Sequence, residues 1–79
     1  FSGAQIINGI KYTTHALERM APEGLGGRGI PPSVVENAIV NGVFSQSRDP
    51  TAVWATYEQV RVLWNYVENA VVTVIKIGR

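Results

Sequence analysis

The residues best suited to chemistry in this 79-residue chain are a single histidine, His15, and an arginine four positions later, Arg19. Histidine is the only side-chain type whose unperturbed pKa lies near neutrality, so it can transfer protons under physiological conditions. Arginine keeps a fixed positive charge that can hold an anion. Together they suit phosphodiester cleavage, which needs proton transfer and positive charge for the transition state. A solvated helix face without a catalytic role would carry the same residues, and their spacing alone leaves both interpretations open.

A hydroxyl, an aromatic residue and several cations extend the candidate site. Thr73 interrupts an apolar stretch at residues 71–75, where its hydroxyl could face a substrate phosphate. Threonine is also common in strands, where the hydroxyl bonds locally, so a structural role stays open. The residues that could bind the flanking nucleotides are Arg28, Arg48, Tyr57 and Arg61. Each alone could equally be a solubilising charge or part of the core.

Composition excludes several other kinds of protein. The chain has no cysteine, which excludes disulfides, a thiolate nucleophile and cysteine metal sites. One histidine and six scattered carboxylates have no spacing typical of a metal site, and no dinucleotide fingerprint is present, so we expect neither metal nor cofactor. The net charge of +1 gives no strongly basic surface. No apolar run approaches the roughly 18–20 residues that span a bilayer.

The elements that must position these residues begin with a helix near 14–21. Either Thr13 or Thr14 can cap its start, and Pro22 disfavours a longer helix. At about 100° per residue, the apolar residues fall on one side of this helix. His15 and Arg19 fall on the opposite side, because positions four apart meet on a helix.

A second helix is predicted near 33–41. The pattern from Ser33 to Glu36 matches a capping box, in which the serine and glutamate side chains bond the first free amides. Gly42 is expected to end the helix in a left-handed conformation. The glycine-rich segment 24–29 before it lacks the lysine and hydroxyl residue of a phosphate-binding loop, so we interpret it as a connection.

The second half of the chain has the period-two pattern of strands. We predict strands at 52–57, 60–67 and 70–77, joined by short polar turns into an antiparallel meander. An Asn-Gly pair at residues 8–9 also predicts a hairpin within 5–12. Two helices on one face of such a sheet give a single α+β domain over residues 1–79.

Three strings in the chain resemble a known group of proteins. They are YTTHALERM at 12–20, RGIPPSVVENAI at 28–39 and VVTV at 71–74. The strings are similar to those of the C-terminal toxin domains of bacterial polymorphic toxins, especially contact-dependent growth inhibition proteins. In that group a helix of this pattern, an R-G-I turn, a second helix and a terminal strand recur in this order. The resemblance covers residues 11–77.

The resemblance implies a fold and an activity. It implies the barnase/EndoU/colicin/RelE-like ribonuclease fold, in which two N-terminal helices pack on a small twisted antiparallel β-sheet whose concave side binds RNA. Such domains cleave RNA, often tRNA, without metal. Carried over by position, His15, Arg19 and Thr73 match the active-site pattern.

The resemblance also implies partners and a setting. A cognate immunity protein would neutralise the domain in the producing cell, and a host factor in the target cell could assist it. The domain would be the C-terminal piece of a larger secreted or surface-displayed protein, acting in the cytoplasm of a neighbouring bacterium. The first residue, Phe1, and the abrupt end after an apolar run agree with that expectation.

Two other functions are compatible with the sequence. One is a non-enzymatic interaction module of a larger protein. The other is a chromosomal RelE-like toxin, although such toxins usually begin at their own methionine and carry more lysine and arginine. RNA cleavage separates the enzymes from the interaction module.

Overall fold

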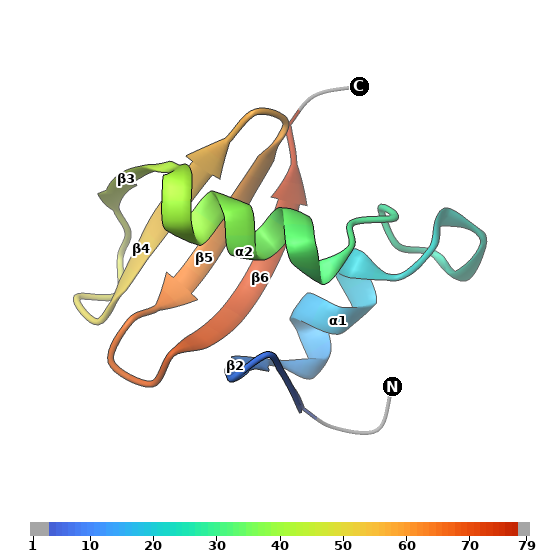
Figure 1. Ribbon diagram of the computed structural model, residues 1–79, viewed down its shortest axis with the longest axis horizontal. Coiled ribbons are helices and arrows are strands. Elements are labelled where there is room, and N and C mark those ends of the chain that lie inside the picture. Colours follow the sequence, from blue (N-terminus) through green and yellow to red (C-terminus); the bar gives the residue numbers. More distant parts are fainter. Residues whose placement is uncertain (1–3, 78–79) are drawn as a thin grey trace.

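A computed structural model describes residues 4–77 of the chain (Figure 1). Along the chain the elements are β1 (Gln5–Ile7), β2 (Ile10–Tyr12), α1 (Thr14–Met20), the short 3-10 helix η1 (Glu23–Leu25), α2 (Pro32–Asn41), β3 (Val43–Gln46), β4 (Ala52–Tyr57), β5 (Val60–Asn65) and β6 (Ala70–Lys76). The strands form one six-stranded sheet in the order β1-β2-β6-β5-β4-β3. Neighbouring strands are antiparallel except β2 and β6, which run parallel. No helix in the described range is long and apolar enough to cross a membrane.

The expected arrangement of two N-terminal helices on an antiparallel sheet is wrong. The domain is a small α+β structure, but the hairpin β1–β2 precedes both helices, which therefore lie in the middle of the chain. The sheet is mixed because β2 pairs in parallel with the last strand, through Tyr12 and Val71. The barnase/EndoU/colicin/RelE-like arrangement, as expected from the resemblance, is corrected accordingly. The expectation was wrong about how the hairpin β1–β2 joins the sheet.

The positions of the individual strands were predicted more accurately than their arrangement in the sheet. The strand predicted at 52–57 is found at those residues, whereas β5 and β6 end before the predicted limits of 67 and 77. The hairpin predicted within 5–12 is also present. Strand β3 was missed because all of its residues are exposed, so no buried face marks it in the sequence.

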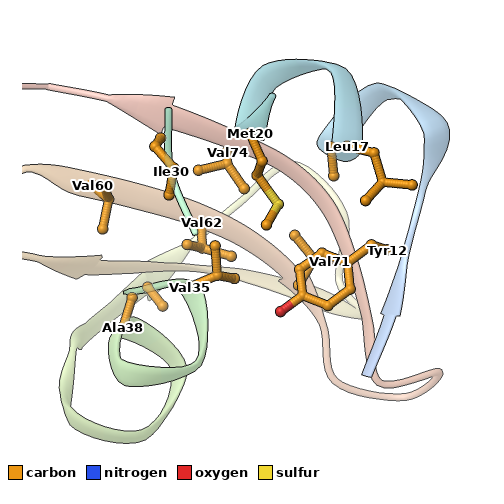
Figure 2. Packing of buried hydrophobic residues seen from close by; sticks show 12 residues of the cluster. Tyr12, Leu17, Met20, Ile30, Val35, Ala38, Val60, Val62, Val71 and Val74 are labelled. Carbon is orange, nitrogen blue, oxygen red and sulfur yellow. The ribbon is translucent and has the colours of Figure 1, made fainter. Parts of the chain in front are cut away.

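One hydrophobic core lies between the two helices and the sheet (Figure 2). In Figure 1 helix α2 crosses in front of the sheet, and α1 lies beside it near β2. The helices bury Ala16, Leu17, Met20, Val35 and Ala38, and the sheet buries Tyr12, Ala55, Val60, Val62, Val71 and Val74. Both helices therefore cover the same face of the sheet.

Thr13 joins β2, α1 and β6. Its backbone N–H donates to the Val71 carbonyl at 3.1 Å, which continues the parallel ladder past β2. Its hydroxyl donates to the Val72 carbonyl at 2.8 Å and accepts from the Ala16 amide at 3.2 Å. The predicted N-cap is confirmed, and the same side chain also fastens the start of α1 to the last strand.

The predicted range of α2, 33–41, is confirmed to within one residue, but the predicted capping at both ends is wrong. The helix begins at Pro32, its N-cap is Pro31, and no side chain caps it, so the Ser33–Glu36 capping box does not form. Proline presets the backbone angle of a first helical turn and lacks an amide that needs a partner there. Gly42 has an extended conformation with φ −76°. It must be glycine because a Cβ would collide with the Ala38 carbonyl and lie 2.9 Å from the Thr56 oxygen.

Tyr12 places a phenol in the core. The residue is 0% exposed, and its hydroxyl has no hydrogen-bond partner within the described part of the chain. Burial, together with the nearby Glu36 carboxylate, raises the pKa of Tyr12 to about 12. A buried hydroxyl without a partner is destabilising, whereas the ring itself contributes apolar contact.

The Thr13 bonds predict a specific loss of stability. Thr13→Val keeps the shape of the side chain but removes the helix cap and the bond to Val72. We expect a loss of about 1–2 kcal/mol in the free energy of unfolding, measured by urea titration. Thr14→Val is the control, because Thr14 lies inside α1 and its loss should be clearly smaller. Equal losses in the two variants would contradict the capping role.

The buried phenol predicts a dependence of stability on alkaline pH. In the unfolded chain Tyr12 ionises near its ordinary value of 10.0, whereas the folded state holds the proton until about 12. Stability is therefore present below pH 10 and falls as the pH rises toward 12. Tyr12→Phe should lessen this fall and raise stability at neutral pH by about 1 kcal/mol. Tyr66→Phe, which leaves Tyr12 in place, should retain the wild-type fall; the same slope in Tyr12→Phe would refute the assignment.

Candidate functional site

The exposed face of α1 carries the two main candidate residues. His15, Glu18 and Arg19 are exposed, while the opposite side of the helix is buried in the core. His15 and Arg19 are one helical turn apart on this face, as their spacing predicts. Their imidazole and guanidinium groups can therefore reach one bound molecule in solvent.

The segment after α1 folds back and brings the backbone of a second arginine beside the end of this helix. The Arg28 N–H donates to the Arg19 carbonyl at 2.8 Å, and the Ile30 N–H donates to the Met20 carbonyl at 3.0 Å. Gly27 permits this close return, because a Cβ there would lie 2.6 Å from the Ala21 carbonyl carbon. The backbones of Arg19 and Arg28 are thus adjacent although nine positions separate them in the chain.

Arg28 also lines a cleft of about 270 Å³ at one end of the sheet. Tyr57, from the end of β4, lines the same cleft, so the structure brings together two of the predicted substrate-binding residues. Lys76, at the end of β6, is a third member that the sequence analysis missed. The alternation along β6 could have indicated it, because Lys76 is two positions from the buried Val74 and so faces the same side.

Thr73 and Arg61 lie on the other face of the sheet. Thr73 pairs with Leu63 and Arg61 pairs with Ile75, whereas the alternate residues of these strands, Val62 among them, face the core. The Arg61 guanidinium lies 4.5 Å from the centre of a Trp54 ring. This helix-free face therefore holds a cation, a hydroxyl and an aromatic ring.

In the described residues Thr73 and His15 are connected only through their chain neighbours, Val72 and Thr13. The Thr13 bond to the Val72 carbonyl fixes the start of α1 beside the residue before Thr73. Within residues 4–77 the side-chain hydrogen bonds involve neither His15, Arg19 nor Thr73. The three side chains are thus free of such bonds to one another in the described residues.

Arg48 lies apart from the other candidates. It lines a separate hollow with Tyr66, in the loop between β3 and β4. Asp49 organises this loop: the Thr51 hydroxyl donates to its carboxylate at 2.6 Å and, with the Thr51 amide, lowers the pKa of Asp49. We assign this hydrogen-bonded turn a structural role.

Over the part of the chain that the structure describes, no group of three or more histidine, aspartate or glutamate side chains is arranged to hold a metal ion. The groups available for chemistry are thus those of α1, the cleft and the helix-free face of the sheet.

Comparison with known proteins assigns the chain to no family. No protein-family model matches it, and no curated protein matches it significantly.

The close return at Gly27 predicts that this glycine is required to place Arg28. Gly27→Ala should destabilise the domain by about 1–3 kcal/mol, because the added methyl group forces the segment away from α1. Gly24→Ala is the matched control, since a Cβ at Gly24 meets no atom within 4 Å. Thermal unfolding measures both variants, and a Gly27→Ala protein as stable as the control would contradict the close contact.

Proposed function

We propose that the chain is a ribonuclease that cleaves RNA without a metal ion. The observation that supports this proposal is the exposed histidine of α1 with Arg19 one helical turn away. His15 and Arg19 share one helix face, and the backbone of Arg28 bonds to that of Arg19. Cleavage of a phosphodiester needs proton transfer and preorganised positive charge, and His15 and Arg19 are residue types that can supply them.

The proposed reaction uses the 2′-hydroxyl of the RNA as its nucleophile. The 2′-oxygen bonds to phosphorus and the bond from phosphorus to the 5′-oxygen breaks, leaving a 2′,3′-cyclic phosphate and a 5′-hydroxyl. The proton lost by the 2′-oxygen is matched by one delivered to the 5′-oxygen. We assign His15 to this proton transfer and Arg19 to the non-bridging phosphate oxygens. Thr73 has no role in this step, because it lies on the opposite face of the sheet from α1.

The wider biological role is proposed from the sequence resemblance. We propose a toxin that cleaves tRNA in the cytoplasm of a neighbouring bacterium, delivered as part of a larger secreted or displayed protein. A cognate immunity protein would protect the producing cell. Because the net charge is only +1, affinity for RNA would depend on local groups, or on a host factor, more than on a basic surface.

A second candidate function is a non-enzymatic interaction module. Strand β3 is an edge of the sheet, and around it Val40, Val43 and Phe44 are 77%, 75% and 50% exposed. No charged residue occurs from residue 37 to residue 47. Edge strands are usually protected by charges or proline, so this one could accept a partner strand.

The ribonuclease proposal predicts that His15→Ala lowers the rate of tRNA cleavage by about 10²–10⁴-fold, the usual contribution of general acid–base catalysis. Arg19→Ala should cause a comparable loss, and cleavage should persist in EDTA. The measurement is single-turnover cleavage of labelled tRNA, with the cyclic phosphate identified on the product.

Two controls accompany this experiment. Circular dichroism and thermal unfolding establish that His15→Ala is folded, as its exposure predicts. Glu68→Ala, an exposed change in the β5–β6 turn, should cleave at the wild-type rate. A folded His15→Ala protein with full activity would remove His15 from the mechanism, and wild-type protein that cleaves no RNA would favour the interaction module.

A further inference from the structure

The cleft beside Arg28 joins parts of the chain that are distant in sequence. We call it the Arg28–Lys76 cleft; its walls come from the segment before α2, from α2 itself, from the β4–β5 turn and from the end of β6. Its volume of about 270 Å³ is close to the lower end of the range for small-molecule sites. It lies on the helix-covered side of the sheet, away from the face that holds Thr73.

Positive charge prevails in this cleft. Arg28 and Lys76 contribute two cations, and Glu58 contributes one carboxylate. Lys76 is half-buried although it lies near the end of β6, so its ammonium group has less water around it than one on an open surface. A charge held in such a position interacts more strongly with a bound anion.

The remaining wall is apolar and aromatic. The buried residues Ile30 and Val60 line the cleft, and the partly buried Val34 of α2 lines it as well. Tyr57 packs against the core on this side and lines the cleft as well. A nucleobase can therefore stack on the Tyr57 ring, since aromatic side chains stack on any of the bases.

The backbone at the rim of the cleft adopts an uncommon conformation. Glu58 has φ +54°, in the left-handed region that residues other than glycine, asparagine and aspartate seldom occupy. It forms the tight β4–β5 turn, in which Tyr57 pairs with Val60. A two-residue hairpin turn requires this conformation, which fixes the position of Tyr57 at the cleft.

We propose that the Arg28–Lys76 cleft binds a mononucleotide unit, with the phosphate on its two cations and the base against Tyr57. This inference rests on the proposed function and adds a nucleotide-binding site to it. The Arg28 N–H bonds to the Arg19 carbonyl, so the backbone of one cleft residue adjoins the end of α1, the helix that carries His15. In an RNA substrate the cleft holds a nucleotide that flanks the cleaved phosphodiester, and it thereby positions that bond.

The test is binding of uridine 3′-monophosphate, followed by amide chemical shifts and by calorimetry. We expect the largest shift changes at Arg28 and at Gln59 of the β4–β5 turn. Lys76→Ala should weaken binding by about tenfold, as expected for the loss of a charged hydrogen-bond donor. Lys11→Ala is the matched control, because it removes the same charge from an exposed position on β2 that does not line the cleft.

The outcomes separate the two proposals. Absence of binding, equal weakening by both lysine variants, or inorganic phosphate binding as tightly as the nucleotide would overturn the cleft proposal. Uridine alone should bind more weakly than the nucleotide; equal affinity would also overturn it. If the nucleotide binds as expected while His15→Ala cleaves RNA normally, the assigned mechanism fails and the cleft stands. If cleavage needs His15 but the nucleotide does not bind, the cleft proposal alone fails.

Discussion

The attachment of Thr13 to the last strand is the interaction on which the arrangement of this domain depends. Its amide bonds to Val71 and its hydroxyl bonds to Val72, at 3.1 and 2.8 Å. These bonds close the parallel pairing of β2 with β6 and place the first turn of α1 beside the middle of β6. Because α1 has only seven residues, this one anchor largely decides which of its faces is buried and which faces solvent. The exposure of His15 and Arg19 therefore depends on the attachment of Thr13 to β6.

The local patterns of the sequence predicted most elements but not how the first hairpin joins the sheet. The Asn-Gly turn, the Thr13 cap and the strand at 52–57 follow from short-range chemistry, and all three are present. The pairing of Tyr12 with Val71 connects residues 59 positions apart, and no local periodicity encodes such a partner. The expected antiparallel sheet with two N-terminal helices failed at this point.

The ends of α2 show how two local rules compete. Ser33 and Glu36 have the spacing of a capping box, but Pro31 and Pro32 precede them and restrict the backbone earlier in the chain. The proline geometry prevails, and the helix begins one residue before the predicted cap. At the other end, Gly42 is required by the proximity of the Ala38 and Thr56 carbonyls and not by a left-handed turn.

The sequence predicted that His15 and Arg19 share one helix face, because a single helical turn sets the distance between them. The candidate site was not predictable where a loop returns, because the contact between Arg28 and Arg19 depends on backbone bonds that glycines permit. This return places Arg28 at the cleft that Lys76 also lines, in a chain whose net charge is only +1. Long-range attraction of RNA is weak for such a chain, so recognition must act at contact distance. The half-buried Lys76 is suited to this, since screening by salt is weaker for partly buried charges than for exposed ones.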